Sequence, residues 1–196
     1  ASSGSGLTTP DPVALASMLA SLAESGVQRA AVEASSHGLD QERLSGIRAS
    51  IGVFTSFSRD HLDYHLTEGA YMAAKMRLFR EVLEPGGTAI ICADMPAAAQ
   101  VLDELQGLGL RIWTYGEAGK EIRLLEATPD GAGQQLRIRV FEREYEIHLP
   151  LPGHFQSLNA LAALGIVLAG GEAAGQAISS VPHLPGVPGR MQLAGT

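Results

Sequence analysis

The chain has one cysteine, few aromatic residues and no long apolar run. With Cys92 alone, an intrachain disulfide and a cysteine-based metal centre are both excluded, and we expect a core thiol within residues 88–93. No stretch approaches the ~20 apolar residues of a membrane span, and no charged-then-apolar leader opens the sequence. These absences favour a reducing, cytoplasmic setting.

Positive charge is also scarce. The chain carries 14 Lys and Arg against 21 Asp and Glu, for a net charge of −7, which argues against a general nucleic-acid-binding or anionic membrane surface. An anionic ligand would therefore have to be held locally, by a few placed cations or by metal ions. Only Lys75 and Lys120 are lysines, so each lysine merits separate consideration.

The pattern of apolar runs and turn residues predicts an α/β protein. Hydrophobic residues make up 45% of the 196 residues, and 23 residues are glycine. Asp11 and Pro12 are typical of a helix start, and Gly26 of a helix end. Strands are then predicted at 30–35, 51–55, 88–93 and 111–115, and helices at 68–83 and 96–108. This alternation predicts a mostly parallel, doubly wound sheet flanked by helices, with Pro-Gly-Gly at 85–87 ending helix 68–83.

The pattern changes after residue 121. Short alternating segments at 122–127, 135–141 and 145–149 predict a small antiparallel β subdomain near residues 122–149, attached to the main sheet. Apolar helices are predicted at 156–169 and 173–180, and the Pro/Gly-rich segment 185–190 is typical of a connector at a domain boundary. Residues 1–6 are small and polar, which predicts a flexible lead-in.

Two clusters of polar side chains follow apolar runs. Glu-Ala-Ser-Ser-His-Gly at 33–38 follows one predicted strand, and Ser-Arg-Asp-His-Leu-Asp-Tyr-His at 58–65 follows the next. Ligands of open α/β sheets bind beyond the carboxyl ends of the strands, so the two clusters predict one shared site. Glu33 is expected to be buried, and because an unpaired buried carboxylate is unfavourable, a cation or metal should lie near it.

Lys75 has an unusual position. Helical spacing puts it on the apolar face of helix 68–83, together with Tyr71, Leu78 and Val82. Burial there would lower the pKa of the amine and free it as a nucleophile. Near metal ions, such an amine can also take up carbon dioxide and become a carbamate. The alternative is a lysine whose amine extends from the edge of this face into solvent.

The remaining polar residues leave several roles open. His61, flanked by acidic residues, suits a divalent-metal or phosphate site, or else caps the next helix. His65 lies four residues on, but no longer ligand motif completes a zinc site. Ser-Ser-His at 35–37 would bind ligand oxygens or satisfy backbone groups, and Arg43 and Arg190 are candidate phosphate clamps or surface arginines. Neither a Gly-x-x-x-x-Gly-Lys-Ser/Thr loop nor a Gly-x-Gly-x-x-Gly motif follows a predicted strand.

The motifs of the chain, taken together, resemble those of the Mur ligase family. They occur in the family's order and span nearly the whole chain: Thr-Thr-Pro-Asp-Pro at 8–12, Glu-Ala-Ser-Ser-His-Gly-Leu at 33–39, Phe-Thr-Ser-Phe-Ser-Arg-Asp-His-Leu-Asp-Tyr-His at 54–65, Ala-Ala-Lys at 73–75, Leu-Pro-Gly-His-Phe at 151–155, Asn-Ala-Leu-Ala-Ala at 159–163 and Pro-Gly-Arg-Met at 188–191. The resemblance implies the central, ATP-binding domain of a cytoplasmic peptidoglycan ligase.

The resemblance also implies a reaction. The chain looks most like the branch of the family that adds the third residue of the stem peptide to UDP-N-acetylmuramoyl-L-alanyl-D-glutamate. In that branch ATP phosphorylates the substrate carboxylate, and the incoming amine attacks the acyl phosphate, with Mg²⁺ offsetting the phosphate charge. The partners implied are this UDP-muramoyl dipeptide and an amino acid, with no nucleic acid and no membrane.

Roles carry over residue by residue. By motif, Glu33 resembles the ligand of a first magnesium ion, and His61 and carbamylated Lys75 resemble the groups that serve a second; these three are the catalytic candidates. The positions that match the UDP-muramoyl site are Thr8, Thr9, Ser35, Gln41 and Arg43. The positions that match the nucleotide site are Asn159, facing the adenine, and Arg190, near the ATP phosphates or ribose.

The sequence departs from the family in several respects. The phosphate-binding Gly-Lys-Thr loop should precede Thr8 by several tens of residues and does not occur, and Ser56 and Gln156 stand where asparagine is usual. We therefore expect a central domain at 7–190, the start of a further domain at 191–196, and no ligase activity from this chain alone. The absent segment should also leave a sheet edge exposed, through which the chain self-associates.

Two other functions remain open. One is another acid–amine ligase of the same superfamily, such as a folylpolyglutamate or cyanophycin synthetase. The other is a non-catalytic binding module, a truncated domain without turnover. The Thr-Thr-Pro and Glu-x-Ser-Ser-His motifs favour the muramoyl type of ligase, whereas the absent phosphate loop favours the binding module.

Overall fold

The computed structural model describes residues 8–58 and 60–186. The chain divides into two compact units: unit 1 comprises residues 1–50 and 58–85, and unit 2 comprises residues 51–57 and 86–196. The predicted lead-in at 1–6, the predicted domain start at 191–196, and Arg190 lie outside the described residues.

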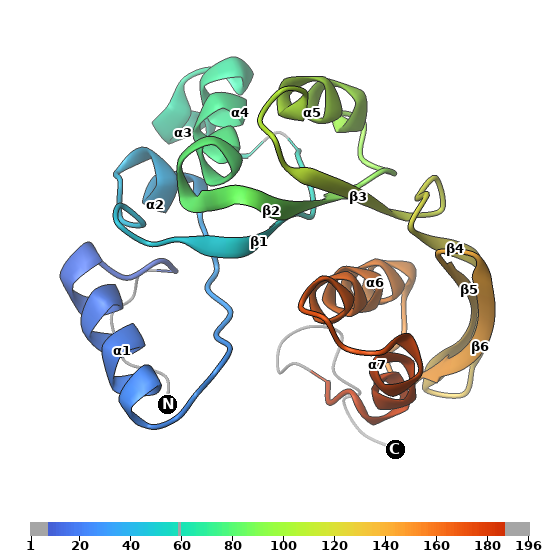
Figure 1. Ribbon diagram of the computed structural model, residues 1–196. Helices are drawn as coiled ribbons and strands as arrows, with labels where there is room; N and C mark the ends of the chain where they lie inside the picture. Colours follow the sequence, from blue (N-terminus) through green and yellow to red (C-terminus); the bar gives the residue numbers. More distant parts are fainter. Residues whose placement is uncertain (1–7, 59, 187–196) are drawn as a thin grey trace. The chain divides into compact units, whose positions relative to one another are not determined.

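Unit 1 begins with helix α1 (Pro12–Glu24), which starts where the sequence predicts (Figure 1). The side chain of Asp11 accepts hydrogen bonds from the backbone N–H groups of Val13 and Ala14, and Pro12 occupies the first helical position. The helix ends at Ser25, and Gly26 adopts a φ of 79°, a left-handed conformation that glycine enters at no steric cost.

The strand predicted at 30–35 is wrong. Residues 27–35 contain no regular secondary structure, and most of their side chains are exposed. A strand exists only through pairing with a neighbour, and none of the strands among the described residues pairs with this segment. The segment ends at Ser35, which caps the short helix α2 (Ser36–Asp40) by accepting a hydrogen bond from the Gly38 N–H.

The helix predicted at 68–83 ends earlier than expected. Two helices, α3 (Leu62–His65) and α4 (Glu68–Arg77), are followed by a π-helical turn, η1 (Leu78–Val82). Strand β2 then begins at Leu83, so residues 85–87 lie inside a strand instead of forming the predicted stop. The wider π turn already takes the chain out of the helix before the proline is reached.

Unit 1 contains a small apolar cluster to which several of its elements contribute. Its fully buried members are Leu15, Leu39, Leu44 and Val82, contributed by α1, α2, the loop after α2, and η1. Partly buried residues pack around them, among them Val32 and Ala34 from the extended segment. This packing holds the extended segment beside α2 although it belongs to no sheet.

Unit 2 contains most of a six-stranded sheet whose order follows the sequence. Its strands are β1 (Ala49–Phe54), β2 (Leu83–Cys92), β3 (Arg111–Gly116), β4 (Ile122–Asp130), β5 (Gly133–Val140) and β6 (Arg143–Leu149). Strands β2, β3 and β4 pair in parallel, whereas β4, β5 and β6 pair antiparallel. The predicted α/β class is confirmed, and the predicted antiparallel part continues the main sheet.

Helices cover both faces of the sheet in unit 2. Helix α5 (Ala98–Leu105) lies on one face, and α6 (His154–Ala169) and α7 (Ala174–Ser180) lie on the other (Figure 1). Helix α6 packs closely, because a Cβ atom added at Gly165 would lie 3.1 Å from Ile122 Cδ1 and 3.3 Å from Ile90 Cγ2. Cys92 is buried at the end of β2, as predicted. Across residues 8–58 and 60–186, every helix is too short or too polar to cross a bilayer.

Candidate active site

The candidate site residues of unit 1 come from three neighbouring segments: the extended segment 27–35 with α2, the α3 region, and α4. Helix α4 contacts both α2 and α3. His61 precedes α3 with a φ of 55°, a left-handed conformation that costs a non-glycine residue about 1 kcal/mol or more. The His61 N–H donates to Asp60 Oδ1 at 2.8 Å, which helps to hold this backbone conformation.

Hydrogen bonds between Thr9 and Ser35 connect the loop before α1 to the start of α2. The Thr9 hydroxyl donates to the Glu33 carbonyl at 2.8 Å and accepts from the Ser35 N–H at 3.0 Å. Because a hydroxyl has only one proton, the Ser35 hydroxyl must be the donor in its 2.9 Å contact with Thr9 Oγ1. Thr9 is completely buried, so its hydroxyl is fully used within the chain.

The second polar feature is a chain of side chains that begins at Arg43. Its guanidinium donates to the Thr9 carbonyl at 2.9 Å and to Gln41 Oε1. Gln41 Nε2 donates to Tyr64 Oη at 3.1 Å, and Tyr64 Oη donates to Asp40 Oδ2 at 2.9 Å. The bonds through Gln41 and Tyr64 all run from the cation toward the Asp40 carboxylate, whereas the bond to the Thr9 carbonyl is a separate branch. Two of the five guanidinium N–H donors are used in these bonds, and the others have no hydrogen-bond partner among the described residues.

The rings of three histidines and two tyrosines gather in unit 1. The ring centroid of His37 lies 4.2 Å from that of Tyr64, 5.0 Å from that of His61 and 5.5 Å from that of His65. The Tyr71 ring lies 5.3 Å from His65 and 5.9 Å from His61. These contacts connect α2, α3 and α4 at the point where both predicted clusters meet.

His65 is the buried member of this ring cluster. Its Nε2 atom has no hydrogen-bond partner among the described residues. Burial lowers the pKa of His65, Asp40 and Asp63 oppose that change, and His37 and His61 add to it. The lowered pKa favours the neutral form of the His65 ring, which packs against Tyr64 and Tyr71.

Lys75 lies on α4, one turn after Tyr71, and is half-buried. Its Nζ atom is 5.4 Å from the centroid of the Tyr71 ring. Burial lowers the pKa of Lys75, while the carboxylates of Asp60 and Glu33 act in the opposite direction. The carboxylates of Asp60 and Glu33 thus lie close enough to influence the Lys75 amine, and the ring contact of His37 with His61 joins the two predicted clusters.

Glu33 itself differs from the expectation. Glu33 is exposed and does not end a strand. The prediction that its carboxylate is buried is therefore wrong, because the segment pairs with no strand that would bury it. Among the described residues, no three His, Cys, Asp or Glu side chains form a group that could hold a metal ion. A metal held by Glu33 or by His61 would need further ligands, such as a carbamate on Lys75 or ligand phosphates.

Sequence comparison identifies the family. Residues 2–167 match the family described as Mur ligase middle domain. The chain belongs to this family. It is 46% identical over 193 residues to the UDP-N-acetylmuramoyl-L-alanyl-D-glutamate–2,6-diaminopimelate ligase of Bradyrhizobium diazoefficiens, covering 96% of this chain and 40% of that protein. The ligase of the same name from Caulobacter vibrioides is 42% identical over 190 residues, covering 97% of this chain and 39% of the relative.

Solved structures agree with this assignment. A structure of a UDP-N-acetylmuramoyl-L-alanyl-D-glutamate–2,6-diaminopimelate ligase is similar with a TM-score of 0.86 and 33% identity, covering 95% of this chain and 39% of that one. MurF from Acinetobacter baumannii shares the fold, with a TM-score of 0.67 at 19% identity over 75% of this chain and 32% of that one. The present chain spans about 40% of the length of the curated relatives that it matches.

Asn159, one of the two residues predicted to bind the nucleotide, lies in unit 2. Asn159 is exposed on α6, and its Nδ2 atom donates to Gln156 Oε1 at 3.3 Å. The start of α6 is anchored by Gln134, a buried residue of β5, which donates to the carbonyls of Leu151 at 2.7 Å and Gly153 at 3.0 Å. Arg190 lies outside the described residues.

Several residues of the site do not stand out as candidates in the sequence. Asp60 and Tyr64 belong to the polar cluster at 58–65, and their acidic and phenolic groups are the features of the sequence that could have marked them as site residues. Asp40 gives no such signal, because its partner Tyr64 is 24 positions away in the sequence. Of the positions predicted to bind the substrate, Thr8 and Gln41 are exposed, whereas Thr9 is buried.

Proposed function

We propose that this chain is the middle part of a cytoplasmic, ATP-dependent ligase that joins the third stem-peptide residue to UDP-N-acetylmuramoyl-L-alanyl-D-glutamate. The observation that carries the proposal is the half-buried Lys75 amine on α4, which interacts with the carboxylates of Glu33 and Asp60 near the His61 ring. The names and 42–46% identity of the curated relatives support 2,6-diaminopimelate as the amino acid.

Lys75 supplies the chemistry that such a site needs. The lowered pKa makes the neutral amine more accessible. The nitrogen lone pair then attacks carbon dioxide, a C–N bond forms, one C=O π bond becomes an oxyanion, and the ammonium proton leaves to solvent. The product is a carbamate, whose two oxygens are the hard donors that Mg²⁺ prefers.

With Lys75 as a carbamate, the oxygen and nitrogen donors of unit 1 suit magnesium. The Glu33 carboxylate would hold a first Mg²⁺ ion, and the His61 imidazole and the Lys75 carbamate would hold a second, together with phosphate oxygens of ATP. When bound, Mg²⁺ neutralises phosphate charge during formation of the acyl phosphate. The hydrogen bond from the His61 N–H to Asp60 Oδ1 supports the strained backbone from which the imidazole projects.

Arg43 is the best-placed group to bind the acidic substrate. It is half-buried, and its bonds to Thr9 and Gln41 fix the plane of the guanidinium. Its remaining N–H donors suit a carboxylate or phosphate oxygen, because both accept paired bonds from a planar guanidinium. Thr8, Ser35 and Gln41 would line the same substrate site, whereas Thr9 holds the segment through its backbone carbonyl and buried hydroxyl.

The proposal is tested on a hybrid ligase, in which this chain replaces the matching part of the full-length Bradyrhizobium diazoefficiens relative. Lys75→Ala should abolish formation of the UDP-muramoyl tripeptide, and added short carboxylates should restore part of the activity. Lys75→Arg should also be inactive, because a guanidinium cannot form a carbamate. Full activity of the Lys75→Arg hybrid would contradict the proposed role.

A further inference from the structure

We propose that Arg77 is a positioning residue that holds the segment 40–43 in the conformation that presents Gln41 and Arg43 to the acidic substrate. This inference rests on the proposed function for the identity of the substrate, but the conformational part can be tested without it. Arg77 ends helix α4, two residues after Lys75. It therefore connects the helix that carries the reactive amine to the segment that carries the substrate-binding candidates.

The contacts of Arg77 reach three different residues. Its Nε atom donates to both carboxylate oxygens of Glu81 at 2.9 Å, one turn further along the chain. Its Nη1 atom donates to the Asp40 carbonyl at 3.0 Å, and its Nη2 atom donates to Glu42 Oε1 at 3.0 Å. Side-chain hydrogen bonds to Glu81 and Glu42 raise the pKa of Arg77. The guanidinium is thus bonded on all of its nitrogens.

The Asp40 carbonyl belongs to the last residue of α2. The final carbonyls of a helix lack partners within the helix, and a cation near them also interacts favourably with the helix dipole. Arg77 supplies both the hydrogen bond and the charge from a different helix. It therefore fixes the point at which the chain leaves α2 and turns toward Arg43.

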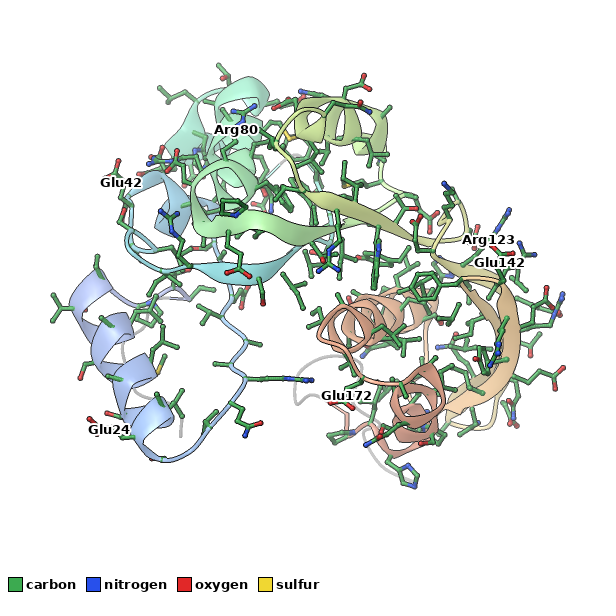
Figure 2. The ribbon with its side chains drawn as sticks, viewed as in Figure 1. Glu24, Glu42, Arg80, Arg123, Glu142 and Glu172 are labelled. Atoms are coloured by element: carbon green, nitrogen blue, oxygen red, sulfur yellow. The ribbon has the colours of Figure 1, made fainter. Side chains whose placement is uncertain are left out.

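Glu42 makes this turn in a conformation that needs support. Its φ is 58°, which is unfavourable for a residue with a side chain. The Glu42 side chain is 66% exposed, whereas the Arg77 side chain is only 23% exposed. Arg77 is therefore the more firmly packed partner, and its hydrogen bond restrains the Glu42 side chain. Glu42 lies at the surface of unit 1, as does Arg80 (Figure 2).

The orientation of the next side chains depends on this turn. The backbone N–H groups of Gln41, Glu42 and Arg43 donate to the carbonyls of His37, Leu39 and Gly38, at 2.9, 3.2 and 2.8 Å. If the turn loosened, the Arg43 guanidinium would lose its alignment with the Thr9 carbonyl and with Gln41. Substrate binding would then weaken, while the nucleotide side in unit 2 would keep its own contacts.

The geometry requires arginine and not merely a positive charge. A planar guanidinium presents N–H donors along several fixed directions, whereas a lysine ammonium is a single point of charge on a flexible stem. Lysine at position 77 would reach the carboxylate of Glu81 or that of Glu42, but would not bond the Asp40 carbonyl at the same time. The charge would be kept and the positioning lost.

The first experiment measures backbone amide hydrogen exchange on the 196-residue chain with Arg77→Met, Arg77→Lys and the control Arg80→Met. In both Arg77 variants, exchange at Gln41, Glu42 and Arg43 should speed up by about tenfold or more, as expected for the loss of charge-assisted hydrogen bonds. Exchange in strand β5 of unit 2 should not change. Unchanged exchange at residues 41–43 in Arg77→Met would overturn the inference, as would full recovery in Arg77→Lys.

The second experiment measures kinetics in the hybrid ligase. Arg77→Met should raise KM for UDP-N-acetylmuramoyl-L-alanyl-D-glutamate by about tenfold, with kcat and the KM for ATP within about twofold of the unsubstituted hybrid. Faster amide exchange without a change in this KM would refute the positioning role. A folded but inactive unsubstituted hybrid would refute the proposed function instead, and the exchange result would still decide the conformational role of Arg77.

Discussion

Single side chains of unit 1 are ordered by the direction of their hydrogen bonds. Arg43 can only donate and the Asp40 carboxylate can only accept, so Gln41 and Tyr64 between them each have one possible orientation. Tyr64 is the link between this polar chain and the histidine rings, because its ring also packs 4.2 Å from that of His37. Tyr64 thus connects the chain of polar side chains, through its hydroxyl group, to the histidine rings, through its own ring.

The variant Tyr64→Phe isolates that hydroxyl group. The ring contacts with His37 and His65 remain, whereas the bonds to Gln41 and Asp40 are lost. We expect the free energy of unfolding to fall by no more than about 1 kcal/mol, since both bonds are exposed to solvent. The side-chain amide protons of Gln41 should exchange faster with solvent in NMR spectra. No change in this exchange, with Tyr145→Phe as the matched control, would show that the chain of bonds is not maintained in solution.

His65 predicts a pH dependence of stability. Because burial lowers its pKa below 6.5, the unfolded chain binds more protons than the folded chain as the pH falls through this range. The free energy of unfolding should therefore decrease on acidification from about pH 7 to pH 5.5. His65→Phe should flatten this dependence and should not destabilise the chain at pH 7, because it removes a buried nitrogen without a partner.

Urea unfolding at several pH values measures this effect. His183→Phe, which replaces an exposed histidine of unit 2, controls for the added apolar ring. A His65→Phe variant with the same pH slope as the unsubstituted chain would show that His65 is not the group responsible.

Among the elements, α2 is fixed by a close approach to the loop before α1. A Cβ atom added at Gly38 would lie 2.7 Å from both Cβ and Oγ1 of Thr9. Thr9 is buried and held by hydrogen bonds, so it cannot move aside easily. We expect Gly38→Ala to lower the free energy of unfolding by about 1–3 kcal/mol.

The matched control for Gly38→Ala lies on α4. Gly69 is helical and has open space where a Cβ atom would lie, so Gly69→Ala should raise the free energy of unfolding by about 0.5–1 kcal/mol. Chemical denaturation of both variants provides the measurement. If Gly38→Ala were as stable as the unsubstituted chain, α2 would not be fixed against Thr9 in the way described.

The elements also show which structural features a sequence can predict. The start of α1 at Asp11 and Pro12 and the six-residue strand β3 depend on local signals, and both were predicted well. The strand predicted at 30–35 was wrong, because the apolar pattern of a segment can be read from the sequence, whereas the presence of a neighbouring strand to pair with cannot. The end of α4 was missed for a related reason, since a π turn leaves no mark in the spacing of apolar residues.

In the candidate site, too, features that depend on local sequence were predictable and features that depend on distant partners were not. The meeting of the clusters at 33–38 and 58–65 was predictable, because each cluster places polar side chains directly after an apolar run. The contact of Arg77 with the Asp40 carbonyl was not, because it joins residues 37 positions apart and depends on how α2 meets α4. Sequence spacing identifies residues that carry chemistry more readily than residues that hold them in place.

For the whole molecule, the exposed segment 27–35 predicts self-association. Its extended backbone carries apolar residues and pairs with no strand among the described residues, and such a segment is a template for pairing with another chain. Light scattering should therefore show a mass that rises with the concentration of this chain. A monodisperse monomer over a wide concentration range would contradict this prediction.

The central claim is that this chain forms the middle of a ligase for the third stem-peptide residue. The most direct test is formation of UDP-N-acetylmuramoyl tripeptide by the hybrid ligase, with UDP-N-acetylmuramoyl-L-alanyl-D-glutamate, 2,6-diaminopimelate, ATP and Mg²⁺, and with the product identified by mass spectrometry. We predict product formation at a kcat within about tenfold of that of the intact relative, and none when 2,6-diaminopimelate is omitted. A folded hybrid ligase that binds both the UDP-muramoyl dipeptide and ATP yet forms no tripeptide would contradict the claim.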